Sequence, residues 1–157
     1  MTILLHDYVP HNPLHKERFA ELNREWLTKY FRVEDYDNAV FNDPEGHILD
    51  KGGAILLAET SDGIVGVGSL IPMEKDVYEI AKMGVTEKCQ AQGIGKKIFL
   101  ALIERAKEKG AKKLFIVSNT SLEPAIKLYR RHGFSDSAEN RHGHYERGDI
   151  TLEYALE

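Results

Sequence analysis

The chain has 157 residues, of which 42% are hydrophobic and 29% charged, so we expect one globular domain over residues 1–157 with a substantial core. Its net charge of −4 provides no basic surface for nucleic acid, and a nucleic-acid-binding protein is not expected. Cys89 is the only cysteine, which excludes an internal disulfide, and no segment resembles a signal peptide or a membrane span. We therefore expect a cytoplasmic protein with no membrane partner.

A short strand and a long helix are predicted at the start of the chain. Residues 3–8 begin with an Ile-Leu-Leu run that favours a strand. Asn12 followed by Pro13 is typical of a helix cap and the first helical residue. Apolar residues then recur at helical spacing, which predicts an amphipathic helix over residues 14–31.

Residues 33–50 are acidic and irregular in pattern. Three interpretations stay open for this segment: a solvated loop, a short second helix, or a region that selects a positively charged substrate.

Three apolar segments follow, separated by turn residues. Residues 53–59 and 64–71 flank Thr-Ser-Asp-Gly, which is a strong hairpin signal. Residues 77–85 follow Pro72 and a charged turn. This pattern predicts an antiparallel meander.

The second half of the chain is predicted to alternate helices and strands. The expected elements are a helix over 94–109 ended by Gly110, a strand over 113–118, a helix over about 122–131 ended by Gly133, and a strand over 150–156. A strand-helix-strand crossover is normally parallel. We therefore expect an α/β (α+β) fold, in which helices flank a mixed, mostly antiparallel sheet.

Residues 85–98 carry the clearest functional signal, because a glycine loop there joins a strand to a helix. The first backbone N–H groups of such a helix are unpaired and favour a phosphate. A Walker A loop is excluded, since Gln90 stands at the first glycine position and Lys97 at the Ser/Thr position. The dinucleotide fingerprint fails at Ile98, its third glycine position. The remaining pattern is Gln90-x-x-Gly93-x-Gly95.

This pattern matches the pyrophosphate loop Arg/Gln-x-x-Gly-x-Gly/Ala of the GNAT N-acetyltransferases. Residues 122–134 read Leu-Glu-Pro-Ala-Ile-Lys-Leu-Tyr-Arg-Arg-His-Gly-Phe, which resembles the GNAT helix that carries Leu-Tyr and is closed by Gly-Phe. The resemblance covers roughly residues 53–156. It implies a GNAT-like fold and an acetyl-CoA-dependent transfer of an acetyl group to a primary amine of a small molecule, by direct attack in a ternary complex.

The resemblance also implies which residues bind acetyl-CoA, the expected co-substrate. The backbone near the end of the strand over 77–85 would polarise the thioester carbonyl, and the loop would hold the pyrophosphate. The expected cofactor-binding residues are Met83, Gly84, Val85, Gln90, Ala91, Gln92, Gly93, Ile94, Gly95, Lys96 and Asn119. Asn119 would bond the pantetheine arm or cap the following helix. Gly84 is consistent with a bulge or a close approach.

Two residues are implied as catalytic. Tyr129 occupies the tyrosine position of the Leu-Tyr helix and is the candidate general acid for the leaving thiolate. The alternative for Tyr129 is a core ring with its hydroxyl bonded to the main chain. Glu79, on the strand leading to the loop, is the candidate general base. Its alternative is a salt bridge with Lys82 or Arg147.

The sequence indicates the residues that would bind the acceptor amine less clearly. Trp26, Tyr30 and Phe31 are expected to border a substrate cleft, as GNAT helices near this position often do. His142-Gly-His144 lacks a nearby third ligand, so we expect no metal.

Three alternatives remain open at this point. The chain could be an acyl-CoA sensor or a catalytically silent GNAT module, or it could acetylate proteins or peptides. A homodimer could form through the free edge of the C-terminal strand.

Overall fold

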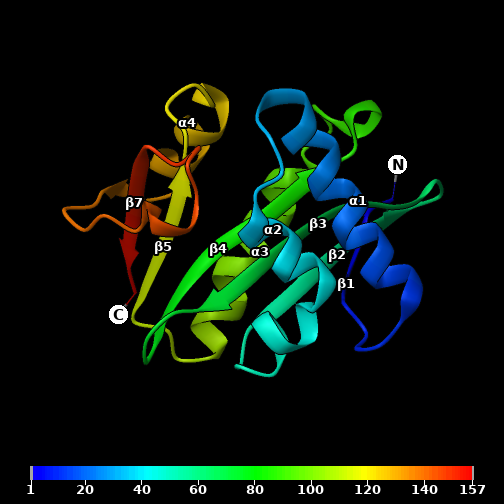
Figure 1. Cartoon of the computed structure of the whole chain (residues 1–157), viewed down its shortest axis with the longest axis horizontal. Coiled ribbons are helices and arrows are strands. Elements are labelled where there is room, and N and C mark those ends of the chain that lie inside the picture. The colour runs from blue at the N-terminus through cyan, green and yellow to red at the C-terminus, as the bar shows by residue number, and fades with distance from the viewer. Residues whose placement is uncertain (1, 157) are drawn as a thin grey trace.

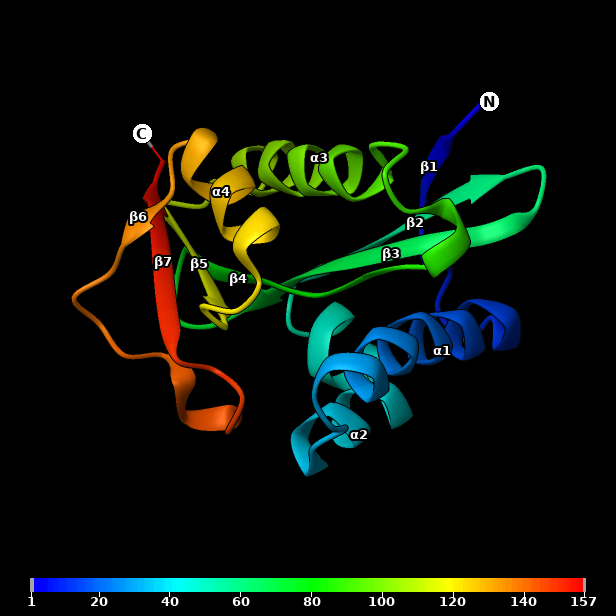
Figure 2. The same cartoon turned by 90° about the horizontal axis from the view of Figure 1, so that it is seen from above.

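The computed structural model describes residues 2–156, and its centre is a seven-stranded sheet with helices on both faces (Figures 1 and 2). Met1 and Glu157, the ends of the expected domain, lie outside the described residues. The strands are β1 (Leu4–Asp7), β2 (Ala54–Thr60), β3 (Gly63–Pro72), β4 (Val77–Val85), β5 (Lys113–Ser118), β6 (Ser135–Asp136) and β7 (Ile150–Ala155). The helices are α1 (Pro13–Tyr30), α2 (Asp35–Asn42), α3 (Ile94–Glu108) and α4 (Glu123–Arg131), with shorter turns η1 (Glu45–Leu49), η2 (Glu87–Cys89) and η3 (His142–His144).

The predicted fold class is confirmed. The strand order is β1-β2-β3-β4-β5-β7-β6, and every neighbouring pair is antiparallel except the parallel pair β4 and β5. The helix α3 connects these two strands, as the crossover rule requires. Asn12 caps α1 as expected, since its Oδ1 accepts a hydrogen bond from the His15 N–H at 3.1 Å.

Two hydrophobic cores lie on opposite faces of the sheet. One is built around α3 and α4 and includes Phe99, and the other lies beneath α1 and α2 and includes Phe19. Figure 2 shows the two pairs of helices on either side of the strands. Each face of β2, β3 and β4 is therefore covered, which explains why their sequences are apolar almost throughout.

The parallel pair β4 and β5 separates early. Their residues pair only from Val77↔Lys113 to Glu79↔Phe115, and β4 continues to Val85 without this neighbour. Past this point the two strands diverge, which opens a space in the middle of the sheet.

A bulge bends β4 within the same stretch. Its pairing with β3 shifts register between Val67 and Ser69, and Lys82 has a left-handed φ of 55°. A β-bulge of this kind changes the direction of the side chains that follow it.

Of the interpretations left open for the acidic segment over 33–50, a short second helix is confirmed and a solvated loop is wrong: the segment forms α2 and η1, and Glu34, Asp37 and Glu45 are buried. One expectation about the edge of the sheet is also wrong. The C-terminal strand β7 is not an edge strand, because the short β6 pairs with its outer side. The sequence pattern did not reveal β6, which has only two residues, so the argument for a homodimer through β7 is lost.

Among residues 2–156, no helix combines the length and the apolar composition needed to cross a bilayer.

Candidate functional site

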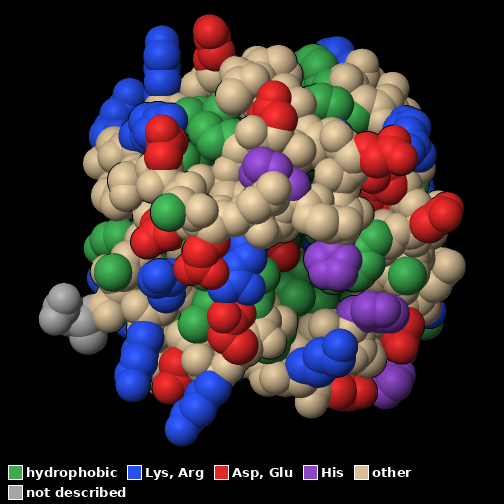
Figure 3. Space-filling model, turned by 60° about the vertical axis from the view of Figure 1, so that its left-hand side comes forward, with side chains coloured by type: hydrophobic (Ala, Val, Ile, Leu, Met, Phe, Trp, Pro, Cys, Tyr) green, Lys and Arg blue, Asp and Glu red, His purple; other side chains and the backbone are tan. Residues whose placement is uncertain are grey.

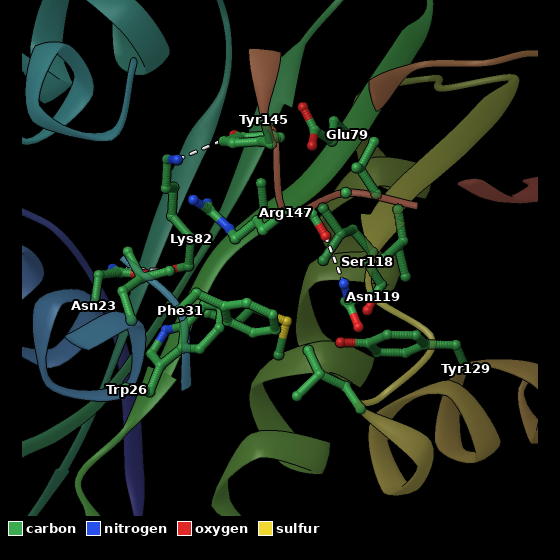
Figure 4. A pocket seen from close by; sticks show the side chains of 18 residues that line it. Asn23, Trp26, Phe31, Glu79, Lys82, Ser118, Asn119, Tyr129, Tyr145 and Arg147 are labelled. Atoms are coloured by element: carbon green, nitrogen blue, oxygen red, sulfur yellow. Dashed lines mark hydrogen bonds between the residues drawn. The ribbon is translucent and has the colours of Figure 1, made fainter. Parts of the chain in front are cut away.

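A cavity of ≈100 Å³ lies where β4 and β5 separate (Figure 4). It is lined from α1, β4, β5, α4 and the segment after η3. The lining residues are Asn23, Trp26, Leu27, Phe31, Glu79, Ile80, Ala81, Lys82, Met83, Ile116, Val117, Ser118, Asn119, Leu122, Tyr129, Tyr145, Arg147 and Gly148. The fold therefore brings both catalytic candidates, Glu79 and Tyr129, to one cavity.

Glu79 is a buried carboxyl group with no polar partner. Its residue is only 5% exposed, and it takes part in no hydrogen bond or ion pair among residues 2–156. Burial raises the pKa of Glu79 to about 7, and this effect outweighs the opposing fields of Lys82 and Arg147. The alternative of a salt bridge to Lys82 or Arg147 is therefore wrong.

Both of those cations pair instead with Asp37 of α2. The Lys82 Nζ lies 2.6 Å from Asp37 Oδ1, and the two terminal nitrogens of Arg147 lie 2.7 and 2.8 Å from the Asp37 oxygens. Arg147 also donates a hydrogen bond to Glu34 Oε2 at 3.0 Å. Burial alone would raise the pKa of Asp37, but hydrogen bonds from Arg147 and the charge of Lys82 lower it to about 2.

Lys82 is enclosed by aromatic rings as well as by Asp37. Its Nζ lies 4.6 Å from the ring centre of Tyr145 and 5.2 Å from that of Tyr36, and it donates a hydrogen bond to the Tyr145 hydroxyl at 3.0 Å. Burial lowers the pKa of Lys82, and Asp37 opposes that shift. Cation–π contacts and a buried carboxylate together replace the water that an ammonium group loses on burial.

Tyr129 lies on α4 with its ring against the α3 core. Its ring centre is 5.2 Å from that of Phe99, and its hydroxyl end faces the cavity (Figure 4). The hydroxyl makes no hydrogen bond to the described part of the chain, so the expected alternative of a bond to the main chain does not hold. Burial raises the pKa of Tyr129 to about 12, so the phenol keeps its proton at neutral pH.

The three aromatic residues that were candidates for the substrate cleft, at the end of α1, do not all lie at the cavity. Trp26 and Phe31 line the cavity and pack edge to face, with ring centres 6.1 Å apart. Tyr30 is 53% exposed and lies outside the cavity, so its predicted place at the cleft is wrong. Tyr30 is the last residue of α1, whereas Phe31 leaves the helical conformation, with φ −144° and ψ −137°, and its ring packs back on Trp26.

The glycine loop presents free backbone donors at the start of α3. The first backbone hydrogen bond there runs from Lys97 N–H to the Gly93 carbonyl at 3.0 Å, so the N–H groups of Ile94, Gly95 and Lys96 have no partner within residues 2–156. Gly93 has a φ of 78°, and a Cβ on it would meet nothing within 4 Å. This arrangement suits an anion.

The side chains of the glycine loop lie in different surroundings. Ile94 is buried in the α3 core, so only its backbone can meet a ligand. Gln90 donates a hydrogen bond from Nε2 to the Val85 carbonyl at 3.1 Å and so closes the loop onto β4. Ala91, Gln92 and Lys96 are exposed.

At the end of β4, Met83 lines the cavity, and Gly84 is pressed against α1. A Cβ on Gly84 would lie 2.7 Å from the Leu22 carbonyl oxygen. The close approach expected at Gly84 is therefore real, and its partner is the backbone of a helix.

Asn119 lines the cavity, but its amide is already engaged within the chain. Its Nδ2 donates to the Arg147 carbonyl at 2.7 Å, and its Oδ1 accepts from the Ser121 N–H at 2.9 Å. The residue that caps α4 is Leu122, so the expected helix cap at Asn119 is wrong. The binding of the pantetheine arm by Asn119 stays a prediction.

A wider groove of ≈760 Å³ adjoins the cavity through Tyr145, which lines both. Its walls come from residues 32–36 and 140–146, and Arg32 forms an ion pair with Glu146 across it. His144 stacks on Tyr36 with ring centres 4.3 Å apart. Figure 3 shows histidines and charged side chains of both signs interspersed on the face toward β7 and α4.

No group of three or more potential His, Cys, Asp or Glu metal ligands occurs within the described part of the chain. Cys89 is buried in the α3 core.

Sequence reasoning missed Asp37 and Tyr145 as members of the site, and it treated Lys82 only as a partner of Glu79. One local signal was available: Glu79 and Lys82 are the two charges inside β4, a strand that is otherwise apolar apart from Tyr78. Charges within a buried strand need partners, and such partners mark a site.

Residues 14–134 match the acetyltransferase (GNAT) family. The uncharacterized N-acetyltransferase YvbK of Bacillus subtilis is 33% identical over 104 residues, which cover 64% of this chain and 67% of that protein. A GNAT-family acetyltransferase from Staphylococcus aureus Mu50 has the same fold, with a TM-score of 0.86, 21% identity and coverage of 99% of this chain and 100% of that one. A Bacillus subtilis acetyltransferase solved in complex with CoA gives a TM-score of 0.74 at 21% identity, with 99% of each chain covered.

Proposed function

The chain belongs to the acetyltransferase (GNAT) family, and on that basis we propose that it transfers the acetyl group of acetyl-CoA to a primary amine of a small molecule. The amine attacks the thioester directly while both substrates are bound. One observation carries this proposal: Glu79 and Tyr129, from β4 and α4, line the same cavity at the point where β4 and β5 separate.

Acetyl-CoA is proposed to lie along the end of β4. The free N–H groups at the start of α3 would hold its pyrophosphate, and Gly95 adjoins β4, because a Cβ on it would lie 3.8 Å from Val85 Cγ2. That the related Bacillus subtilis acetyltransferase was solved with CoA supports this choice of ligand. The main chain from Met83 to Val85 would then polarise the thioester carbonyl.

The two candidate residues supply the proton transfers. Glu79, with a pKa of about 7, takes a proton from the substrate ammonium, and the amine lone pair attacks the carbonyl carbon. The C–S bond breaks as the tetrahedral intermediate collapses. Tyr129 gives its proton to the leaving thiolate, which yields the amide and CoA thiol. The attacking nitrogen gives up its second proton through solvent to the tyrosinate, which regenerates the phenol, and solvent removes the proton held by Glu79.

The side of the cavity that would bind the acceptor favours a small amine with an apolar body. Trp26, Leu27 and Phe31 provide apolar surface, and the Glu79 carboxylate attracts a cation. The cavity of ≈100 Å³ at Glu79 supports a small molecule, whereas an extended peptide would have to lie in the adjoining groove of ≈760 Å³.

The experiment measures both the binding of acetyl-CoA and the acetylation of added amines. Calorimetric titration with acetyl-CoA, with ATP and NADH as controls, should give selective binding of acetyl-CoA. Release of CoA thiol should then depend on the added primary amine, with one N-acetyl product formed for each thiol released. Binding without turnover on any amine would favour an acyl-CoA sensor instead. Turnover restricted to peptides would favour a protein acetyltransferase.

A further inference from the structure

Lys82 and Arg147 line the cavity together with Glu79, yet neither forms an ion pair with it. Figure 4 shows the four side chains Glu79, Lys82, Tyr145 and Arg147 around the same space. Both cations are held by Asp37, which is wholly buried and also accepts a hydrogen bond from the Glu34 N–H at 2.9 Å. Glu34, whose Oε2 accepts a hydrogen bond from Arg147 at 3.0 Å, supplies the second negative charge, so the two cations are compensated without Glu79.

A buried cation needs a counter-charge, and Glu79 would be the remaining unpaired carboxylate of this cavity if Asp37 lost its charge. Arg147 keeps its charge at any working pH, so its field would act on Glu79 even if Lys82 released its proton. A Glu79 carboxylate paired in this way would be a weaker base, and its oxygens would be occupied.

We propose that Asp37 is a positioning residue that keeps Lys82 and Arg147 from Glu79 and so leaves the Glu79 carboxylate free for the acceptor ammonium. The inference rests on the proposed function for the role of Glu79 as base. The pairing of charges that it describes is independent of that role.

The groups that face Glu79 come from three parts of the chain. They are Lys82 of β4, Tyr36 of α2, and Tyr145 and Arg147 of the segment after η3. Burial raises the pKa of Tyr36 and of Tyr145, so both phenols stay neutral through the working range. The charges that act on Glu79 are therefore those of Lys82 and Arg147, whose buried partners are Asp37 and Glu34.

The experiment measures the pKa of Glu79 directly, by carbon-13 NMR of the glutamate carboxyl groups, with the signal assigned by its loss in Glu79→Gln. Asp37→Asn keeps the size of the side chain and removes its charge. We expect it to lower the pKa of Glu79 by about one unit or more. Lys82→Met removes a cation and should raise that pKa. A purely structural role for Asp37 predicts no such pair of opposite shifts.

The same variants are then assayed for activity. The acidic limb of kcat/KM against pH should move in the direction of the NMR value in both variants. Asp62→Asn, an exposed carboxylate in the turn between β2 and β3, is the matched control and should change neither quantity. An unchanged Glu79 pKa in folded Asp37→Asn would overturn the inference. If that variant does not fold, Lys82→Met is compared with the double variant Lys82→Met/Asp37→Asn, and an equal Glu79 pKa in these two would overturn it. If the NMR shifts occur but Glu79→Gln retains full activity, the proposed base is wrong and the charge pairing stands.

Discussion

Gly84 of β4 lies directly against the backbone of Leu22 in α1, so closely that a Cβ on Gly84 would be 2.7 Å from the Leu22 carbonyl oxygen and 3.0 Å from its carbonyl carbon. The contact fixes the distance between the helix that carries Trp26 and the strand that carries Glu79 and Met83. Both walls of the cavity therefore depend on the absence of a side chain at position 84.

Gly84→Ala should destabilise the protein by about 1–3 kcal/mol, because the added methyl group meets backbone atoms that cannot rotate away. Chemical denaturation measures this change. Gly143→Ala is the control, since a Cβ there meets nothing within 4 Å and the change in stability should stay within about 0.5 kcal/mol. Equal stability of the two variants would contradict the close contact.

Gly95→Asp should weaken the binding of acetyl-CoA without lowering the stability of the protein. A carboxylate in the first turn of α3 is favourable toward the helix dipole, so thermal stability should be unchanged or slightly higher. The same charge would repel the pyrophosphate of acetyl-CoA, and we expect its Kd to rise at least about tenfold, a loss of roughly 1.4 kcal/mol. Calorimetry measures the Kd, with Gly143→Asp as the control for the added charge. A normal Kd in the stable Gly95→Asp variant would place the pyrophosphate elsewhere.

Glu79→Gln should lower kcat/KM by about 10²–10⁴-fold, the range expected when a general base is lost. In the unmodified protein kcat/KM should rise with pH and level off above the Glu79 pKa of about 7, and this limb should vanish in the variant. Glu17→Gln, on the exposed side of α1, is the control and should retain the full profile. An unchanged limb in Glu79→Gln would assign the titration to another group.

The same substitution should change stability in a defined direction. The folded pKa of Glu79 is about 7 and lies above the unfolded value of about 4.3, so the folded state loses stability as pH rises between these two values. Glutamine carries no charge. Glu79→Gln should therefore be more stable than the unmodified protein by about 2–4 kcal/mol above pH 7, with the difference shrinking to near zero below pH 4. Unfolding curves recorded at pH 4 and pH 8 give this comparison.

Tyr129→Phe should reduce kcat by about 10–100-fold while the Kd for acetyl-CoA and the Tm stay close to normal. The reason is that the lost hydroxyl makes no hydrogen bond to the described part of the chain, whereas the ring keeps its packing on Phe99. Tyr30→Phe is the matched control, because Tyr30 is exposed and outside the cavity. Unchanged turnover across the pH range would remove Tyr129 from the mechanism.

Most of the elements could be predicted from the sequence because their signals are local. The strand over 113–118 coincides with β5, and the helix over 94–109 differs from α3 by one residue. The family resemblance was also carried by short motifs, such as Gln90-x-x-Gly93-x-Gly95, whose meaning depends on neighbours along the chain. The two-residue strand β6 and the turn η1 lacked such a signal, since so short a segment has no period to detect.

Local patterns in the sequence by themselves determined the fold class and the glycine loop before α3, and the family resemblance that they carry implied Glu79 and Tyr129. Only the tertiary structure decided which charges pair. Asp37 binds Lys82, 45 positions away, and Arg147, 110 positions away, while Tyr30 turns outward beside the inward Phe31. A spacing pattern reports on one helix face or one strand, whereas the partner of a buried charge depends on which elements pack together. That packing leaves Glu79 without a counter-ion in the cavity.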